Sequence, residues 1–409
     1  MTAMIAVEEA LARVLASAET PLEEETVALD AAFGRALARD ILARRTQPPF
    51  PNSAMDGYAL RAVDTASPPA MLEIVGESAA GRAFAGKVGP GQAARIFTGA
   101  PMPEGADAIA IQEDVRREGD RIVLAAPIAS GDNLRPAGLD FPEGEILIRA
   151  GRRLTPRDVA LAAAANHPEL FVRRRARVAI LATGDELVAP GGTLGPSQII
   201  ASNHLSVAGI VAACGAAPID LGIAADTVAA VDSAIGRARS AHADVLVTLG
   251  GASVGDHDLV QKALVEAGME LGFWRIAMRP GKPLMHGRLG SMRVLGLPGN
   301  PTSSTVCAIL FLRPLLRALH GEPNVGADPG ETGRLGADVP ANGVRQDYMR
   351  ASVRRADDGV LVATPLDAQD SSLVKVIARA DGLIVRSPHA APAKTGDTCR
   401  VIVFGELGV

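Results

Sequence analysis

The sequence predicts a multidomain protein in which a parallel α/β domain is combined with a helical domain and two β domains. Between residues 177 and 325, apolar runs with strand character alternate with helical patterns, which is typical of a parallel α/β sheet. Residues 50–141 and 326–409 instead carry short alternating or β-branched runs. Helical patterns occur on both sides of the first β region, so we expect a small β domain inserted into the helical one.

The helical domain is expected to comprise residues 1–49 and 142–176 and is therefore discontinuous in sequence. Asp30 stands at the N-cap position of one of its helices, and Thr155 with Pro156 has the pattern of a cap and first-turn residue in another. The helical patterns cover residues 5–18, 30–38 and 155–165.

Both β domains are expected to be small. In the inserted domain, residues 50–141, the predicted strands cover residues 71–75, 93–97, 108–112 and 121–124. The C-terminal domain, residues 326–409, carries the short runs VLVAT, LIVR and CRVIVF, which predict a small β barrel or sandwich.

The α/β domain, residues 177–325, is read as alternating strands and helices. Its predicted strands are RVAILATG, APIDLGI, DVLVTLGG, LGFWRIAM and two closely spaced ones at residues 284–287 and 293–297. Its predicted helices cover residues 202–214, begin at Asp226, follow Asp258, and cover residues 302–319.

Composition argues against nucleic-acid binding. The 409 residues are 48% hydrophobic and 21% charged, as in an ordinary soluble globular chain. Aromatic residues make up only 3%, and the net charge is −5, so the chain lacks the stacking platforms and basic surface that nucleic acid requires. A basic run at Arg173–Arg175 with Arg177 fits either a local anion site or a solvated approach to a strand.

Cysteine use and the N-terminus predict a cytoplasmic protein. Cys214, Cys307 and Cys399 are widely separated and form no C-x-x-C pair, so neither a disulfide framework nor a zinc site is indicated. Glu8 and Glu9 interrupt the first apolar stretch, and no run reaches the roughly 18 apolar residues that a membrane span requires. We expect no membrane contact.

The segment VLVTLGGASVGDHD, residues 245–258, is the most informative motif. An apolar strand leads into a glycine-rich turn, and then into Asp256 and Asp258. Glycines at positive φ let backbone N–H groups converge on phosphate oxygens, while carboxylates are ligands that Mg²⁺ prefers. The motif therefore predicts a site for a phosphorylated ligand and a metal ion.

Other polar motifs follow the remaining strands. Because ligands bind at the carboxyl ends of strands in an open parallel sheet, these motifs are expected to meet at one edge. Each has a simpler alternative: TGDEL and Asp226 as helix caps, RPGKP as a surface turn, and LPGNP as a capped helix start. The charged side chains gathered there would be Asp185, Glu186, Asp226, Asp256, Asp258, Arg279 and Lys282.

Two motifs lie in the inserted β domain. PNSAMDGYALR contains Asp56 as its only acid, and RIFTGAPMPEGADAIAIQED contains Thr98 and Glu113. By residue chemistry alone, each motif fits either part of a site or an ordered turn.

Taken together and in this order, NSAMDGYA, RIFTGAPMPEGADAIAIQED, TGDEL, GGASVGDHD, RPGKP and LPGNP resemble the MoeA and gephyrin E-domain family of molybdopterin molybdenumtransferases. The resemblance spans nearly the whole chain. It implies a homodimer built through the helical domain, with the inserted β domain of one subunit facing the α/β domain of the other. It also implies transient contact with other cofactor-biosynthesis proteins and apo-molybdoenzymes.

The reaction implied by the resemblance inserts molybdate into adenylylated molybdopterin, with Mg²⁺-dependent hydrolysis and release of AMP. Asp56, Thr98, Glu186, Asp226, Asp258 and Lys282 would be the catalytic residues, of which Glu186, Asp226 and Asp258 would bind Mg²⁺. The ligand-binding residues would be Gly250, Gly251, Ser253, Gly255, Arg279, Pro298, Gly299, Asn300, Ser303, Arg350 and Ser371.

Two features of the resemblance qualify these roles. Arg279 stands where the family often has Lys, so a planar fork replaces a point charge. In the C-terminal domain, a small shift of register would put Arg345 and Ser372 in place of Arg350 and Ser371. The alternatives to the main activity are a molybdopterin adenylyltransferase and a non-catalytic gephyrin-like scaffold.

Overall fold

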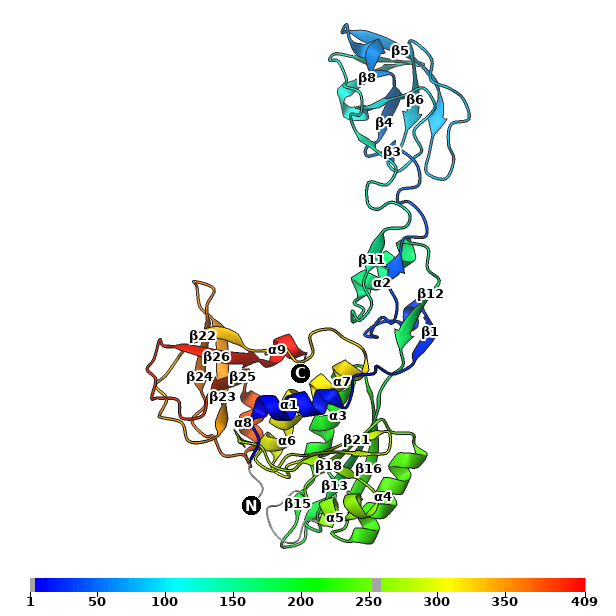
Figure 1. Ribbon diagram of the computed structural model, residues 1–409. Coiled ribbons are helices and arrows are strands. Elements are labelled where there is room, and N and C mark those ends of the chain that lie inside the picture. The colour runs from blue at the N-terminus through cyan, green and yellow to red at the C-terminus, as the bar shows by residue number, and fades with distance from the viewer. Residues whose placement is uncertain (1–3, 252–258, 409) are drawn as a thin grey trace.

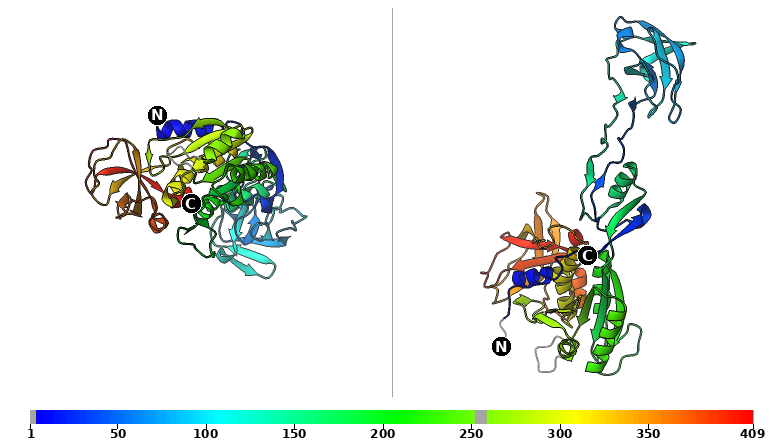
Figure 2. Two further views of the ribbon diagram at one scale, coloured as in Figure 1. Left: turned by 90° about the horizontal axis from the view of Figure 1, so that it is seen from below. Right: turned by 45° about the vertical axis from the view of Figure 1, so that its right-hand side comes forward.

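The protein is an elongated molecule with a compact body and a projecting arm (Figure 1). The computed structural model describes residues 4–251 and 259–408. The body contains the α/β domain and the C-terminal β domain, and the arm carries the inserted β domain at its far end. Figure 2 shows the arm clear of both body domains after a further turn of 45°.

The base of the arm is a two-stranded ribbon rather than a helical bundle. β1 (Glu24–Ala28) pairs antiparallel with β12 (Glu169–Arg173), so the chain enters and leaves the arm side by side. Further out, β2 (Ile41–Leu42) pairs with β11 (Ile146–Ile148). The predicted third helix is confirmed as α2 (Pro156–Ala164), which begins with a capping box between Thr155 and Asp158.

The helix predicted over residues 30–38 is wrong. Only a short 3₁₀ turn, η1 (Leu29–Ala31), forms there, and Asp30 lies within it rather than at its cap. Gly34 follows with φ of +70°, a left-handed conformation that ends helical geometry. The first predicted helix does form, as α1 (Val7–Ala16).

The inserted domain is built on one six-stranded sheet in the order β7-β4-β6-β5-β9-β8. All four strands predicted for this region lie in it. The strands of this sheet are β4 (Gly57–Leu60), β5 (Ala70–Ser78), β6 (Gln92–Ile96), β7 (Ala108–Ile111), β8 (Val115–Glu118) and β9 (Arg121–Leu124). β3 (Asn52–Ser53) and β10 (Leu134–Arg135) form a separate small ribbon beside it. The domain also contains the 3₁₀ turns η2 (Ala62–Thr65) and η3 (Gln112–Asp114).

The α/β domain contains a mixed six-stranded sheet in the order β16-β13-β17-β21-β20-β18. The first four strands are parallel, as predicted, and the last two extend the sheet with antiparallel pairing. The bounds are β13 (Arg177–Thr183), β16 (Ala217–Ala224), β17 (Val245–Leu249), β18 (Glu270–Phe273), β20 (Met285–Leu289) and β21 (Met292–Leu297).

Helices cover both faces of this sheet. Side chains of α1, α3 and the last helix pack in one hydrophobic cluster, and those of α4 and α5 pack in another on the opposite face. The helices are α3 (Asn203–Ala213), α4 (Val228–Ser240), α5 (Leu259–Glu266) and a continuous last helix made of α6 (Pro301–Cys307), the π segment η4 (Ala308–Leu312) and α7 (Arg313–Leu319).

The last helix is long and apolar enough to span a membrane by length and composition alone. It covers Pro301–Leu319, and 78% of its apolar window is buried inside the protein. It therefore has the packing of a core helix.

The C-terminal domain closes on itself as a small barrel. Because β23 pairs with both β24 and β25, the five strands in the order β23-β24-β22-β26-β25 form a closed ring. Its elements are β22 (Glu331–Leu335), β23 (Gln346–Arg355), β24 (Leu361–Pro365), β25 (Gly382–Arg386), β26 (Thr398–Val403), α8 (Val374–Arg379) and α9 (Phe404–Leu407).

A strand from the α/β segment joins this barrel. The predicted strand LGFWRIAM divides into β18 and a separate β19 (Met278–Arg279), and β19 pairs with β23. The RPGKP motif therefore starts from the barrel's sheet and not from the parallel sheet. It nevertheless reaches the same edge, because the barrel packs against the α/β domain there.

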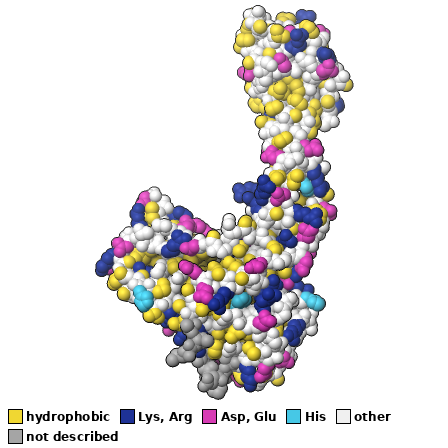
Figure 3. Space-filling model, viewed as in Figure 1, with side chains coloured by type: hydrophobic (Ala, Val, Ile, Leu, Met, Phe, Trp, Pro, Cys, Tyr) yellow, Lys and Arg dark blue, Asp and Glu magenta, His cyan; other side chains and the backbone are white. Residues whose placement is uncertain are grey.

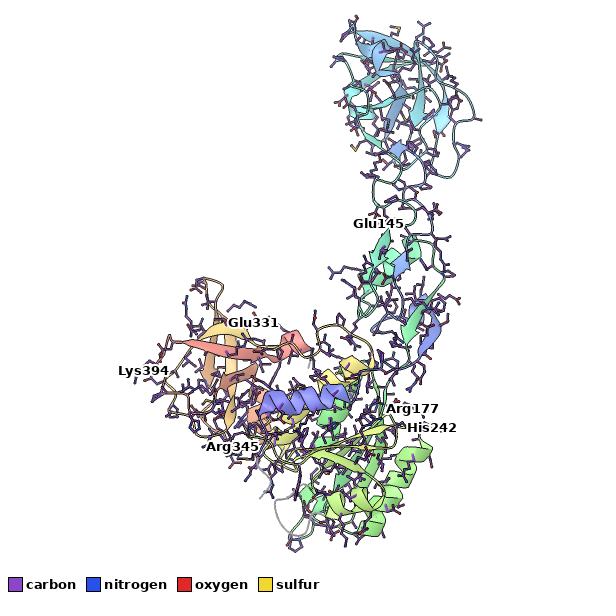
Figure 4. All side chains as sticks on the ribbon, in the orientation of Figure 1. Glu145, Arg177, His242, Glu331, Arg345 and Lys394 are labelled. Carbon is purple, nitrogen blue, oxygen red and sulfur yellow. The ribbon has the colours of Figure 1, made fainter. Side chains whose placement is uncertain are left out.

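The junction between arm and body is held by paired charges. Arg174 donates to both oxygens of Asp244, each at 2.8 Å, and to Glu23 at 2.6 Å. Asp244 is buried and also accepts the backbone N–H of Arg177 at 2.8 Å. Arg177 marks this junction in Figure 4. Within the basic run, the Arg174 side chain is thus neither fully solvated nor free for an anion, because it is paired with Glu23 and Asp244 at the junction.

A second pairing reinforces the junction from the side of the last helix. Arg153 forms an ion pair with the buried Glu322, which also accepts from Arg317 at 2.7 Å. Arg153 further donates to the carbonyl of Gly34 at 2.8 Å. One arm residue therefore binds both the arm's own backbone and a body carboxylate.

His320 makes the junction sensitive to acid. The imidazole is buried, and its Nε2 accepts the backbone N–H of Ala176 at 3.1 Å, which requires that nitrogen to be unprotonated. Burial, aided by the nearby Arg153, lowers the pKa of His320 from its ordinary 6.5 to about 4. Because the folded pKa is depressed, the unfolded chain binds the proton first, and stability falls as pH drops from about 6.5 to about 4.

We therefore expect His320 to contribute about 3 kcal/mol to the loss of unfolding free energy between pH 7 and pH 4. Urea unfolding of the wild type and of His320→Gln across this range measures it. The variant should show the shallower pH dependence, and equal slopes would contradict the prediction.

Candidate active site

A cavity of 830 Å³ lies where the carboxyl ends of the parallel strands meet the barrel. We call it the anion compartment. Its lining includes Thr183, Gly184, Glu186, Asp226, Gly250, Gly251, Leu259, Val260, Arg279, Pro280, Gly281, Lys282, Pro283, Pro298, Gly299, Asn300, Ser303, Arg345, Gln369, Asp370 and Ser371. The motifs TGDEL, RPGKP and LPGNP therefore reach one cavity, as the sheet-edge argument predicts.

One wall of the anion compartment is acidic. Asp185 and Asp226 exchange hydrogen bonds across the edge of the sheet: the N–H of Asp226 donates to Asp185 Oδ1 at 3.1 Å, and the N–H of Asp185 donates to Asp226 Oδ2 at 3.4 Å. Glu186 lies beside them in the lining. The two loops thus hold each other, and Glu186 and Asp226 line the cavity whereas Asp185 does not.

The capping alternatives for these acids do not hold. The N-cap of α4 is Thr227, whose hydroxyl accepts from the N–H of Ala230 at 3.2 Å, so Asp226 is not needed as a cap. TGDEL leads into the short strand β14 (Leu187–Val188), which pairs with β15 (Ile199–Ile200), and not into a helix. Asp226 is therefore free to serve the cavity.

The floor of the anion compartment is glycine backbone. Gly250 has φ of +93° and Gly251 has φ of +64°, conformations that L side chains rarely adopt. A Cβ on Gly250 would lie 2.7 Å from the carbonyl oxygen of Thr183, and one on Gly251 would overlap the side chain of Val260. Ser253, Gly255, Asp256 and Asp258 of the same motif lie outside the described residues.

The cavity also has a cationic wall. Arg279, Lys282 and Arg345 line it, and Arg345 lies at the rim of the barrel beside the α/β domain (Figure 4). Arg279 is ion-paired with the buried Asp347, and this contact raises the pKa of the Arg279 guanidinium above its ordinary value. The Arg279 side chain is 55% exposed, so its guanidinium can also contact a ligand in the cavity.

The loop at residues 369–371 docks on the start of the last helix. The N–H of Thr302 donates to the carbonyl of Ser371 at 3.1 Å, and Asn300 Nδ2 donates to Ser371 Oγ at 2.8 Å. The helix start is therefore partly occupied by protein. Because the Ser371 hydroxyl accepts from Asn300, its own proton remains available to a ligand.

Arg350 does not line the cavity. It is almost fully buried, with its Nη1 on the carbonyl of Tyr348 at 3.0 Å, and it also donates to the carbonyl of Gln369. Its backbone N–H donates to Gln369 Oε1 at 2.9 Å. Its guanidinium thus supports the loop that carries Ser371, and Arg345 takes the place in the lining.

Asp56 and Thr98 come together, but at the far end of the arm. Asp56 Oδ1 accepts from the backbone N–H of Thr98 at 2.7 Å and from its hydroxyl at 2.8 Å. These bonds, the backbone one most, lower the pKa of Asp56 below its ordinary value. Within one chain the pair is separated from the anion compartment by the length of the arm (Figure 1).

The donor set suits Mg²⁺. Among the described residues no group of three potential metal ligands occurs, but Glu186 and Asp226 both line the cavity. Mg²⁺ is commonly held by one or two carboxylates together with substrate phosphates, so two carboxylates beside a glycine floor fit this ion.

Arg279 also allows a test of the Arg-for-Lys difference. Arg279→Lys is expected to keep the ion pair with Asp347 and change the unfolding free energy by less than about 1 kcal/mol. Arg279→Ala leaves a buried carboxylate without this partner and should cost about 1–3 kcal/mol. Urea unfolding compares the two, and an alanine variant as stable as the wild type would show that the pair contributes nothing.

The fold and the cavity define a multidomain protein with a cavity at a parallel sheet edge that is lined by both carboxylates and cations. Three family models match: the MoeA N-terminal region (domain I and II) over residues 5–166, a probable molybdopterin binding domain over 179–318, and the MoeA C-terminal region (domain IV) over 332–404. The chain belongs to the MoeA family. It is a transferase of molybdenum cofactor biosynthesis.

Relatives and solved structures agree over the full length. Proteins called molybdopterin molybdenumtransferase from Haemophilus influenzae and Bacillus subtilis are 31% and 33% identical, covering 99% and 98% of this chain and 100% and 94% of their own. Two crystal structures of Pyrococcus horikoshii MoeA proteins have TM-scores of 0.83 and 0.84 at 32% and 26% identity. Each covers 98% of this chain, with 99% and 100% of the solved chain covered.

Proposed function

We propose that this protein inserts molybdate into adenylylated molybdopterin and releases AMP. The supporting observation is the anion compartment, whose lining combines carboxylates, cations and glycine backbone in one cavity. Phosphates of the pyrophosphate link suit glycine backbone, and molybdate is a tetrahedral dianion that requires cationic and hydroxyl donors. Membership in the MoeA family supports the same assignment.

The cationic wall would bind the oxyanions. Lys282 offers a point charge with three donors, whereas Arg279 and Arg345 offer planar forks. Ser371 adds the hydroxyl proton that Asn300 leaves free. Together these groups would hold molybdate next to the phosphates, with its oxygens neutralised from several directions.

The acidic wall would hold Mg²⁺. Glu186 and Asp226 would be its ligands among the residues that the structure describes, and Asp258 is the third ligand that the sequence predicts. When bound, the ion supplies positive charge to phosphate oxygens while the phosphorus–oxygen bond breaks and AMP leaves. The reciprocal bonds between Asp185 and Asp226 keep the two loops in place for this role.

The active form would be a homodimer with shared sites. Asp56 and Thr98 lie on the arm, so they can reach an anion compartment only if a second copy supplies it. A two-fold interface would give two equivalent sites, each with the arm of one subunit and the body of the other. We place this dimer in the cytoplasm, with cofactor-biosynthesis proteins and apo-molybdoenzymes as transient partners.

Mixing two inactive variants tests the shared site. Asp56→Ala and Glu186→Gln proteins are unfolded and refolded together, and molybdate-dependent AMP release is measured. Random assembly should restore about a quarter of the wild-type rate, because half the dimers would carry one intact site. No recovery, with dimers present and each variant folded, would contradict shared sites.

AMP release from adenylylated molybdopterin, with and without molybdate, tests the activity itself. Molybdate-dependent release supports the insertase. Consumption of MgATP with molybdopterin would instead indicate an adenylyltransferase, and tight binding without release would indicate a scaffold.

A further inference from the structure

A second cavity of 520 Å³ adjoins the anion compartment. The two share the lining residues Thr183, Glu186, Gly250, Gly299 and Asn300, so they meet along one loop edge. The second cavity lies under the ribbon of β14 and β15, between the starts of α3 and α8. We call it the apolar compartment.

The two compartments differ in chemistry. The branched apolar side chains of the apolar compartment are those of Leu187, Ile199, Ile200, Leu249 and Val374; its polar lining includes Glu186 and Asn300 at the shared edge, and its described lining contains no Lys or Arg. The anion compartment, by contrast, contains three such cations. A ligand that fills both must be apolar at one end and anionic at the other.

Large apolar side chains are unusually exposed at this second cavity. Ile199 is 57% exposed, Ile200 is 38% exposed and Val374 is 48% exposed. Isolated exposed apolar residues are common, but a cluster that lines a cavity beside polar groups is typical of a binding site. The cluster continues directly into the proposed catalytic cavity. We therefore take the occupant of the second cavity to be another part of the same small ligand.

The boundary between the compartments is open backbone. Gly250 and Gly299 face each other there, and a Cβ on Gly299 would lie 3.6 Å from the Cα of Gly250. Asn203 holds this edge by donating from Nδ2 to the carbonyl of Gly299 at 2.6 Å. The absence of side chains on both glycines leaves a path for a ligand to cross.

We propose that the apolar compartment binds a planar heteroaromatic ring of the substrate whose phosphates lie in the anion compartment. Branched side chains of β15 and α8 would pack on the ring faces, and Ser202 with His204 would meet its polar edge. His204 Nδ1 is buried without a hydrogen-bond partner, so reorientation of this ring toward a ligand would satisfy it.

This proposal rests on the proposed function and refines it. Adenylylated molybdopterin has two heteroaromatic rings, adenine and pterin, and the cavity chemistry admits either. The two sources are distinguishable because AMP carries only the first ring and molybdopterin only the second.

The test measures binding by calorimetry with three probes: AMP, molybdopterin under anaerobic conditions, and inorganic phosphate. Ile200→Asn replaces an apolar side chain by a neutral polar one, so it changes no charge near the phosphates. Leu205→Asn is the matched control, because Leu205 is 58% exposed in the same segment but does not line the cavity. Lys282→Ala is the converse variant for the anion compartment.

Ile200→Asn should weaken one ring-bearing probe at least tenfold and leave phosphate within twofold, whereas Leu205→Asn should change none. Lys282→Ala should weaken phosphate and both larger probes. The probe that responds to Ile200→Asn identifies the ring. Unchanged affinity for both ring-bearing probes, an equal loss for phosphate, or wild-type protein that binds neither probe would overturn the proposal. This experiment measures binding and not turnover. Failure of this proposal can therefore be distinguished from failure of the insertase activity, which is tested by AMP release.

Discussion

Asp226→Asn is expected to lower AMP release by roughly a hundredfold or more while leaving the fold intact. The substitution removes one of two described carboxylates on the acidic wall, and loss of a charge that holds a catalytic metal commonly costs several kcal/mol of the barrier. The asparagine oxygen can still accept the N–H of Asp185, so the two loops should remain joined.

The measurement is single-turnover AMP release as a function of Mg²⁺ concentration. The variant should require more Mg²⁺ and remain slow at saturation. Asp232→Asn is the control, because Asp232 is an exposed carboxylate on α4 away from the cavity lining. A rate within twofold of the wild type at all Mg²⁺ concentrations would remove Asp226 from the mechanism.

Arg174→Ala is expected to give the largest loss of stability. It leaves Asp244 buried with only the backbone N–H of Arg177, and breaking a buried pair typically costs 3–5 kcal/mol. Because the Arg174 side chain is 32% exposed, solvent offsets part of this, and we expect a loss of about 2–3 kcal/mol.

Chemical denaturation measures the loss, and small-angle scattering shows whether the arm gains freedom. Arg149→Ala is the control, since its pair with Asp40 lies on the same arm but its side chain is 73% exposed and should cost less than about 1 kcal/mol. The double variant Arg174→Ala/Asp244→Asn should be less destabilised than Arg174→Ala alone. Equal losses for Arg174→Ala and Arg149→Ala would show that the junction pair is no stronger than a surface one.

Much of the anion compartment could be predicted from the sequence because its loops follow strands of one parallel sheet. Glu186, Asp226 and Gly250 each follow the end of a parallel strand, and parallel strands bring such ends together. The antiparallel pairing of the last two strands of the sheet, β20 and β18, was harder to predict, because antiparallel and parallel strands have the same local sequence pattern.

The contributions from the barrel depended on pairings that no local pattern specifies. Arg279 belongs to β19, which pairs with β23 across a long stretch of chain. Arg345 precedes β23, whereas Arg350 lies within it and is buried. The resemblance located the motif but not which arginine faces the cavity, since that depends on the barrel's closure.

The ion-pair partners at the junction could not be predicted from the sequence either. The basic run beginning at Arg173 gave no sign of the partners of Arg174, because Glu23 and Asp244 come from two distant segments. Mixed charges are interspersed over the visible surface of arm and body (Figure 3), so composition alone does not reveal which of them are paired and buried.

The ribbon at the base of the arm makes the arm a removable module. Glu24 and Arg173 are cross-strand partners, so the chain leaves the body and returns to it at neighbouring points. A short turn could join the two strands there without disturbing α1 or the sheet of the α/β domain. The body would then be an excised ligand-binding unit, and arms from related proteins could be grafted onto it at the same two positions.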